Sequence, residues 1–171
     1  MGKRKTIITV IGGSAASRGE LLAAEEVGRE IARRGAVLVC GGLGGIMEAA
    51  CRGAKSAGGL TVGILPGVDR RGANDFVDIP LPSGMGYARN ILVAYSGDAV
   101  IAIGGKHGTL SEIAFASIKG TPVVSLGSWE LDESRLPSPL VHAKDAKDAV
   151  DKAFALAAKR HARRKAKEDE E

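Results

Sequence analysis

One stretch of the sequence places anion-binding residue types next to a carboxylate. An apolar, β-branched run at residues 99–103 leads into the turn GGKHG at 104–108, and apolar residues then recur at helical spacing from Thr109. A helix start leaves backbone N–H groups unpaired and carries about +0.5 charge, and a turn without Cβ atoms lets a phosphate reach those donors. Glu112 follows one helical turn later, on the rim of the same predicted pocket. The alternative is that the glycines only tighten the turn and that Glu112 complements the helix dipole.

Two further glycine-rich turns end predicted strands. The first, GGS at 12–14, follows the apolar run 5–11, and the second, GGLGG at 41–45, follows the buried run 36–40. Strands that alternate with helices favour a parallel sheet, in which the carboxyl ends of the strands lie at one edge and bind ligands. We therefore expect all three turns to converge on one crevice.

The whole pattern predicts an α/β protein: a single-domain modified Rossmann fold with a mostly parallel sheet and helices on both faces. Further strands are expected at 60–65, 76–79, 123–126 and 139–142, and helices at 19–34, 46–57, 86–96, 109–119 and 145–164. Residues 1–158 form the predicted ligand-binding domain, and 159–171 form a charged helix end or tail. The stretch 66–83 is expected to be a binding loop, in which Arg70, Arg71 and Asp75 either close over a ligand or stay solvated.

Composition narrows the functional class. The 171 residues carry a formal net charge of +4, and much of that excess comes from the basic run 159–167, which the acidic residues 168–171 follow at once. Because this acidic end would repel phosphate backbones, we do not expect a nucleic-acid partner. No apolar run approaches the roughly 18 residues of a membrane span, and the beginning of the chain resembles a strand rather than a signal peptide. We therefore expect a cytoplasmic protein with no membrane partner.

Two kinds of common site are not matched by the sequence. Cys40 and Cys51 fit neither a disulfide framework nor a zinc pattern, so we expect both as buried small side chains and we expect no metal site. The chain also has no GxxxxGKS/T phosphate loop, and its first turn lacks the GxGxxG spacing of dinucleotide-binding proteins. These differences argue against ATP hydrolysis and NAD binding.

Two of the glycine-rich segments resemble motifs of a known group. Residues 41–50, GGLGGIMEAA, are similar to the GGGPGxMEAAN turn of the LOG-like Rossmann proteins, the cytokinin riboside monophosphate phosphoribohydrolases once called lysine decarboxylases. Residues 104–112 resemble their PGGxGTxxE motif, with Gly104 and Lys106 replacing a proline and a glycine, and Arg89 stands where that family has the arginine of MHxRK. The combination of ARN and GGKHGTLSE is more similar to the branch that includes the molybdenum cofactor carrier proteins. A more distant resemblance is to DprA-type Rossmann domains.

The resemblance implies a binding or carrier protein for a phosphorylated, nucleotide-like small molecule, with no required cofactor and with a nucleotide or a molecule like the molybdenum cofactor as its ligand. The alternative is a nucleoside 5′-monophosphate phosphoribohydrolase that cleaves the N-glycosidic bond with Glu112 and Arg89 as catalytic residues. A third hypothesis is nucleic-acid binding of the DprA type, against which the missing aromatic platforms argue. Family members are usually homodimers, and the apolar Ile91, Leu92 and Phe115 are expected at such an interface.

Arg89 and Lys106 each allow two interpretations. Arg89 is expected to clamp a phosphate or to form a surface ion pair, and Lys106 to serve a ligand more anionic than a monophosphate or to face solvent. The complete set of predicted ligand-binding residues is Gly12, Gly13, Ser14, Gly41, Gly42, Gly44, Gly45, Glu48, Arg89, Asn90, Gly104, Gly105, Lys106, His107, Gly108, Thr109 and Glu112.

Overall fold

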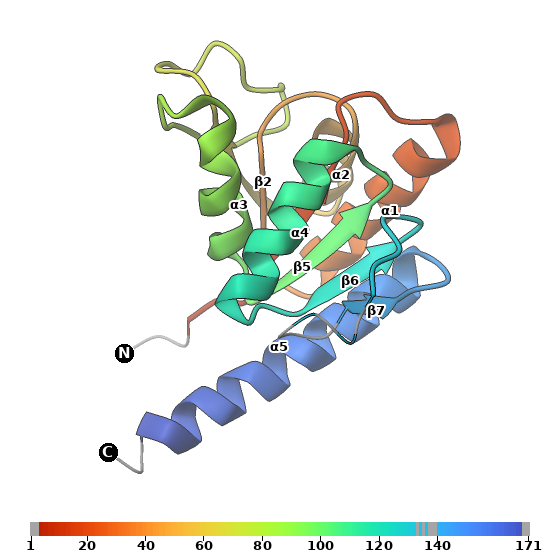
Figure 1. The fold of residues 1–171 in the computed structure, drawn as a ribbon. Helices are drawn as coiled ribbons and strands as arrows, with labels where there is room; N and C mark the ends of the chain where they lie inside the picture. Colours follow the sequence, from red (N-terminus) through yellow and green to blue (C-terminus); the bar gives the residue numbers. More distant parts are fainter. Residues whose placement is uncertain (1–3, 133, 135, 137–139, 169–171) are drawn as a thin grey trace.

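A computed structural model describes residues 4–132, 134, 136 and 140–168 of the chain. Seven strands form one sheet in the order β4-β3-β2-β1-β5-β6-β7, and the neighbouring strands pair in parallel (Figure 1). The strands are β1 (Ile7–Gly12), β2 (Val37–Cys40), β3 (Leu60–Leu65), β4 (Ile79–Pro82), β5 (Ala99–Ile103), β6 (Val123–Leu126) and β7 (Leu140–His142). The chain is therefore an α/β protein with a Rossmann-like parallel sheet, as predicted.

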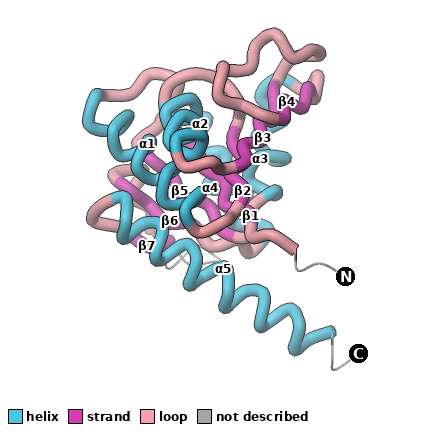
Figure 2. Tube along the Cα trace, turned by 180° about the vertical axis from the view of Figure 1, so that it is seen from behind, coloured by secondary structure: helices cyan, strands magenta, loops and turns pink. Residues whose placement is uncertain are grey.

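Helices cover both faces of the sheet. They are α1 (Arg18–Arg33), α2 (Ile46–Ser56), the 3₁₀ turn η1 (Gly86–Arg89), α3 (Asn90–Ser96), α4 (His107–Lys119) and α5 (Ala146–Glu168). Helices α3 and α4 lie side by side in front of the sheet in Figure 1, and α1, α2 and α5 lie on the opposite face, nearer the viewer in Figure 2. The sheet thus separates two apolar cores, and its central strands β2 and β5 are buried along their whole length.

Several elements differ from the sequence-based prediction. The extended piece expected at 76–79 is wrong in position, because the Asn74 carboxamide accepts from the Phe76 N–H and holds a turn there, and β4 pairs with β3 only from Ile79. The helix expected at 86–96 is split into η1 and α3, with Gly86 at φ +54°. Helix α4 begins at His107 rather than Thr109.

Helix α5 continues to Glu168, beyond the predicted end at 164, and projects away from the sheet toward the C-terminus (Figure 1). Two contacts fasten its middle to the body: the Arg160 guanidinium donates to the Gly97 carbonyl, and His161 Nε2 lies 2.8 Å from Asp98 Oδ1. Residues 159–168 of the predicted tail are therefore helical. Residues 169–171, and Pro139 of the expected edge strand, lie outside the described residues.

The two cysteines are buried, as predicted, and their sulfur atoms lie 3.5 Å apart between the end of β2 and α2. The Gly42 N–H donates to Cys40 Sγ, so this thiol also supports the turn that follows β2. Among the described residues, no helix is both long enough and apolar enough to cross a membrane.

Helices α1 and α2 pack at backbone-to-backbone distance. A Cβ atom placed on Gly53 would lie 1.8 Å from the carbonyl oxygen of Glu25, and one on Gly28 would lie 1.9 Å from that of Ala50. Real Cβ atoms do not approach so closely, so these glycines set the distance between the two helices. The contact also fixes the start of α2 against the sheet edge where the glycine-rich turns lie.

We predict that Gly53→Ala lowers the free energy of unfolding by about 3 kcal/mol, because the new methyl group must push α1 and α2 apart. Gly19→Ala, at a position of α1 with no atom within 4 Å of the new Cβ, is the matched control and should change stability by less than about 1 kcal/mol. Urea denaturation followed by circular dichroism measures both. Equal midpoints for the two variants would show that the helices are not held at this distance.

Candidate functional site

A cavity of about 530 Å³ opens at the carboxyl ends of β1 and β5. This is the size of a pocket for a small molecule, and it lies at the sheet edge where parallel α/β proteins bind ligands. Its walls come from all three glycine-rich turns, from η1 and from the starts of α2 and α4. The lining residues are Gly12, Gly13, Ser14, Ala15, Leu43, Met47, Pro66, Gly86, Tyr87, Arg89, Asn90, Lys106, Gly108, Thr109 and Glu112.

The first and second turns support each other directly. The Ile46 N–H donates to the Gly13 carbonyl at 3.0 Å, and a Cβ on Gly45 would lie 2.4 Å from the carbonyl oxygen of Ser14. Gly45 has φ +68°, a conformation that favours glycine. The second turn therefore supports the first, and both turns contribute residues to the cavity wall.

The third turn leads into α4 with little room for side chains. Gly105 has φ +96°, and a Cβ there would lie 2.2 Å from Thr109 Oγ1. Lys106 precedes α4 as its N-cap without a side-chain hydrogen bond to the helix, so no side chain caps the first N–H groups. Gly108 and Thr109, at this uncapped start, line the cavity. The geometry suits an anionic group that accepts hydrogen bonds from the start of α4.

Arg89 and Glu112 form a buried charged pair in the cavity wall. The two side chains are each 8% exposed, and Arg89 Nη1 lies 3.8 Å from Glu112 Oε1, too far for a hydrogen bond. The Arg89 guanidinium donates instead to Asn90 Oδ1 at 2.6 Å and to the Gly41 carbonyl at 3.3 Å. Its Nε atom is buried and has no hydrogen-bond partner among the described residues. Two of the five N–H groups of Arg89 therefore donate to protein acceptors among the described residues, and the Nε–H is shielded from solvent.

Burial shifts the pKa of both groups. Loss of hydration raises the pKa of Glu112 from 4.5 to about 7, although the positive charge of Arg89 opposes the shift. Burial likewise lowers the pKa of Arg89, against the attraction of Glu112, but a guanidinium remains charged at neutral pH. Near pH 7 the site thus holds a fixed cation beside a carboxyl group that exists in both protonation states.

A short hydrogen-bond chain ties this pair to α4. The carboxamide of Asn90, which accepts from Arg89, donates from Nδ2 to Ser111 Oγ at 3.0 Å. The Ser111 hydroxyl donates in turn to the Gly108 carbonyl at 2.7 Å. Asn90 therefore orients the guanidinium relative to the start of α4, and it also lines the cavity.

Nine of the predicted residues line the cavity, and the others do not. The nine are Gly12, Gly13, Ser14, Arg89, Asn90, Lys106, Gly108, Thr109 and Glu112; the second-turn glycines Gly41, Gly42, Gly44 and Gly45 lie outside its lining, as do Glu48, Gly104, Gly105 and His107. Glu112 is an interior group rather than the rim residue expected, because α4 turns it toward the sheet with Thr109 and Ile113. On the loop 66–83, Arg71 pairs with Asp69 and is 90% exposed, which is the solvated alternative.

Sequence reasoning missed the apolar wall of the cavity. Leu43 and Met47 lie within the second-turn motif, but their types point to core packing, and nothing in the spacing indicates that they face a ligand. Pro66 and Tyr87 come from a loop and a 3₁₀ turn without a periodic pattern. Tyr87 is 90% exposed, and an exposed aromatic ring next to the motif arginine was the one available signal.

Comparison with known proteins places the chain in a family. The model of the SLOG cluster4 family matches residues 5–158. The chain belongs to this family of LOG-like Rossmann proteins. An uncharacterised protein of Archaeoglobus fulgidus is 49% identical over 119 residues, which are 70% of this chain and 78% of that protein.

Solved structures agree with this assignment. The molybdenum cofactor binding protein of Rippkaea orientalis is 36% identical with a TM-score of 0.85, and the molybdenum cofactor carrier protein of Chlamydomonas reinhardtii is 37% identical with a TM-score of 0.81. Each match covers 91% of this chain and 99% of the other. DNA processing protein A of Streptococcus pneumoniae is 20% identical and is similar in fold alone, with a TM-score of 0.68 over 87% of this chain and 62% of its own.

We predict that Glu112 makes folding pH-dependent. The pKa of Glu112 is raised from 4.5 in the folded state. Its favourable contribution to the free energy of unfolding is therefore fully present below pH 4.5 and is lost as the pH rises through about 7. The glutamine of Glu112→Gln imitates the protonated acid. The stability of the parent relative to this variant should therefore fall by about 3 kcal/mol between pH 4.5 and 8, measured by urea denaturation.

The exposed Glu130 provides the control for this measurement, since Glu130→Gln removes a carboxylate from a solvated position. The free energy of unfolding of Glu130→Gln should stay within about 0.5 kcal/mol of that of the parent across the same pH range. A flat difference for Glu112→Gln as well would mean that Glu112 is not desolvated in the folded protein.

Proposed function

We propose that this protein binds and carries a phosphorylated, nucleotide-like small molecule similar to the molybdenum cofactor, a phosphorylated pterin that holds molybdenum as part of the cargo. The observation that carries the proposal is the cavity at the start of α4, in a chain that matches two molybdenum cofactor-binding proteins over 99% of their length. The protein needs no cofactor of its own in this role. Its place of action is proposed to be the cytoplasm, on the sequence grounds given above.

The residues that line the cavity suit the two parts of such a ligand. The uncapped start of α4, the Lys106 side chain and the charge of the Arg89 guanidinium together favour a phosphate. Leu43 and Met47 offer an apolar surface for a flat heterocycle. When Glu112 is protonated, its neutral carboxyl group can donate a hydrogen bond to the ligand.

A phosphoribohydrolase is the second candidate function, and one observation favours it. A carboxyl group with a pKa of about 7 beside a buried arginine is the kind of group that takes part in acid–base chemistry at neutral pH. In this role Glu112 would act at the ribose and Arg89 would hold the phosphate. Lys106 argues against the hydrolase function, because it adds a charge to the turn that binds the monophosphate in the LOG-like hydrolases.

Binding without turnover distinguishes the two functions. We predict that AMP and inorganic pyrophosphate raise the melting temperature in differential scanning fluorimetry, because a ligand that binds only the folded state stabilises it. Chromatography of the same AMP samples should detect no adenine above the protein-free level. Adenine release that Glu112→Gln and Arg89→Lys both abolish would establish the hydrolase instead.

Lys106→Ala, which removes an exposed charge without disturbing the core, tests the location of the site. It should weaken pyrophosphate binding about fivefold or more, as expected for loss of a charge-assisted contact. Lys165→Ala removes the same charge from the exposed end of α5 and should leave the affinity unchanged. If neither variant alters binding, the anion lies elsewhere.

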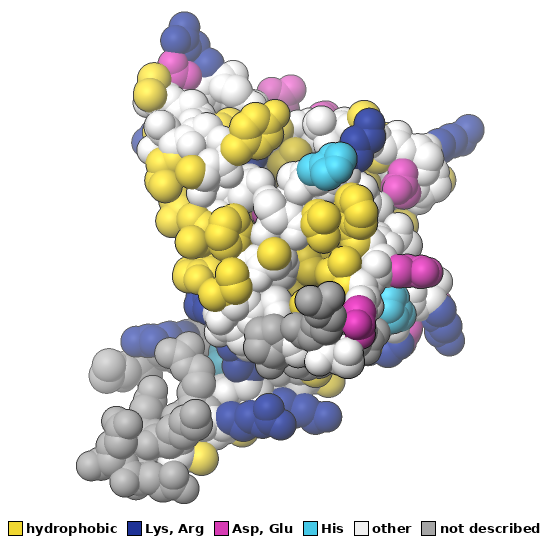
Figure 3. Space-filling model, in the orientation of Figure 1, with side chains coloured by type: hydrophobic (Ala, Val, Ile, Leu, Met, Phe, Trp, Pro, Cys, Tyr) yellow, Lys and Arg dark blue, Asp and Glu magenta, His cyan; other side chains and the backbone are white. Residues whose placement is uncertain are grey.

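We further propose that the protein is a homodimer that pairs through the outer face of α3 and α4. Leu92 and Ile118 are 40% and 69% exposed on this face, and apolar side chains gather over both helices in Figure 3, whereas Ile91 and Phe115, which the sequence also suggested for an interface, are partly buried. An isolated monomer rarely leaves such a surface uncovered. Binding through a DprA-like nucleic-acid surface is not part of this proposal, since that likeness concerns the fold alone.

Light scattering at micromolar concentration should give the mass of a dimer for the parent and that of a monomer for Leu92→Glu combined with Ile118→Glu, because buried charges oppose association. Leu22→Glu is the control, because Leu22 is 61% exposed on α1, on the other side of the sheet. A parent that elutes as a monomer, or a Leu22→Glu variant that dissociates equally, would contradict the proposed interface.

A further inference from the structure

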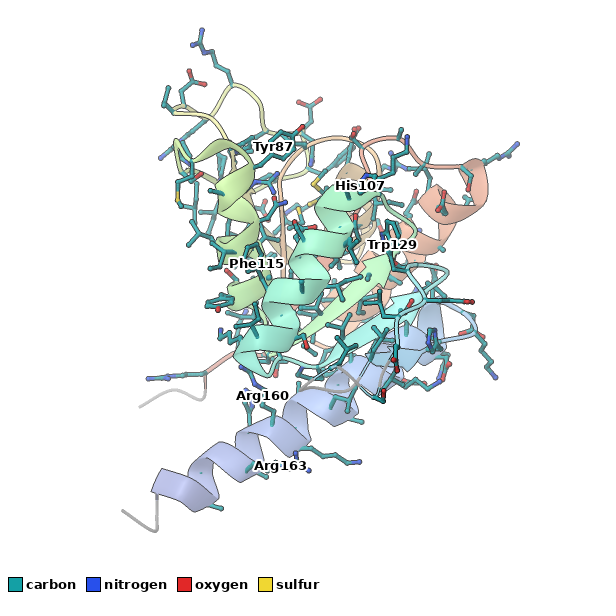
Figure 4. All side chains as sticks on the ribbon, in the orientation of Figure 1. Tyr87, His107, Phe115, Trp129, Arg160 and Arg163 are labelled. Carbon is teal, nitrogen blue, oxygen red and sulfur yellow. The ribbon has the colours of Figure 1, made fainter. Side chains whose placement is uncertain are left out.

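A groove of about 580 Å³ adjoins the cavity on the side of α4 that faces η1. Tyr87, Asn90, Lys106 and Gly108 line both the cavity and the groove, so the two spaces share a wall at the start of α4. His107 and Phe115 line the groove and do not line the cavity. In Figure 4 the ring of Phe115 lies between α3 and α4, with Tyr87 and His107 toward the upper ends of the two helices.

The groove offers aromatic surface close to positive charge. The Tyr87 side chain is 90% exposed, and the imidazole of His107 lies 6.0 Å from the indole of Trp129, centroid to centroid. Trp129 does not line the groove, but its Nε1–H donates to the Lys106 carbonyl at 3.2 Å and so holds the indole next to His107. Exposed rings next to a cation are the surface on which nucleobases stack. The groove is therefore suited to bind a flat heterocycle by stacking.

The phosphate position lies between the two spaces. An anion held by Lys106 and the start of α4 touches the wall that the cavity and the groove share. A ligand bound there has room for one arm in the cavity, against Leu43 and Met47, and for another in the groove, against His107 and Phe115. A linker of two phosphates matches this arrangement better than one phosphate, because Lys106 and the buried Arg89 then face separate groups.

We propose that the cavity and the groove together bind a dinucleotide: two nucleoside-like arms joined by a pyrophosphate, with the pyrophosphate at Lys106 and the start of α4. This inference rests on the proposed function and adds to it the class of ligand. One arm is the heterocycle held in the cavity. The second is a nucleoside whose base stacks in the groove.

Isothermal titration with AMP, ADP and diadenosine pyrophosphate tests the proposal. Diadenosine pyrophosphate should bind at least about tenfold more tightly than AMP or ADP, since stacking of a second base contributes roughly 1–3 kcal/mol. Phe115→Ala removes a groove ring, and Ala88→Trp fills the groove from the exposed η1 turn. Both variants should lose that tenfold advantage and bind AMP as the parent does.

The remaining outcomes separate the dinucleotide proposal from the carrier function. If AMP and pyrophosphate bind but diadenosine pyrophosphate binds no more tightly than ADP, or keeps its advantage in both variants, the dinucleotide proposal is wrong and the carrier function stands. If none of these ligands binds, the carrier function fails and the dinucleotide proposal fails with it. If an oligothymidylate binds the parent more tightly than diadenosine pyrophosphate does and loses this affinity in both groove variants, the groove holds single-stranded nucleic acid and the dinucleotide proposal is overturned.

Discussion

The charge of Arg89 is buried at the edge of the sheet, and the surrounding structure is arranged to keep it there. Removing a guanidinium from water costs several kcal/mol unless nearby groups replace the lost hydration. The Gly41 carbonyl, the Asn90 carboxamide and the carboxyl group of Glu112 do so from three elements. A Cβ on Gly41 would lie 2.7 Å from Arg89 Nη2, so a larger residue here would have to displace the guanidinium. These contacts therefore hold the end of β2, the 3₁₀ turn η1 and helix α4 in fixed positions relative to one another.

Close backbone contacts extend this fixed arrangement to helices α1 and α2. The α1–α2 contact through Gly28 and Gly53 positions α2, and the Ile46 N–H at its start holds the first turn by the Gly13 carbonyl. The cavity wall thus depends on a helix contact on the opposite face of the sheet. A chain with few large aromatic side chains achieves this rigidity by bringing backbones together instead.

The sequence was sufficient for the fold and for the position of the cavity, because both depend on local patterns. Apolar runs ending in glycine define the parallel strands, and the rule that ligands bind at their carboxyl ends places the pocket. The sequence was insufficient to predict which way individual side chains point. Whether Glu112 faces solvent or the sheet depends on which face of α4 packs against the strands, and that face combines the polar Thr109 and Glu112 with Ile113, a mixture that hydrophobic spacing does not identify. Tyr87 and Leu43 line the cavity for tertiary reasons without any sequence period.

The protonation of Glu112 decides what the site does with an anion. With its pKa near 7, the carboxyl group is mostly neutral in mildly acidic solution, where it can donate a hydrogen bond and does not repel a phosphate held by Arg89 and Lys106. Above neutral pH it is ionised, which weakens anion binding but would favour the positive charge that develops on a ribose during glycosidic cleavage. Holding a ligand and hydrolysing it therefore make opposite demands on one side chain. Because burial raises the pKa of Glu112 to about 7, the neutral form that the proposed carrier function requires predominates only below neutral pH.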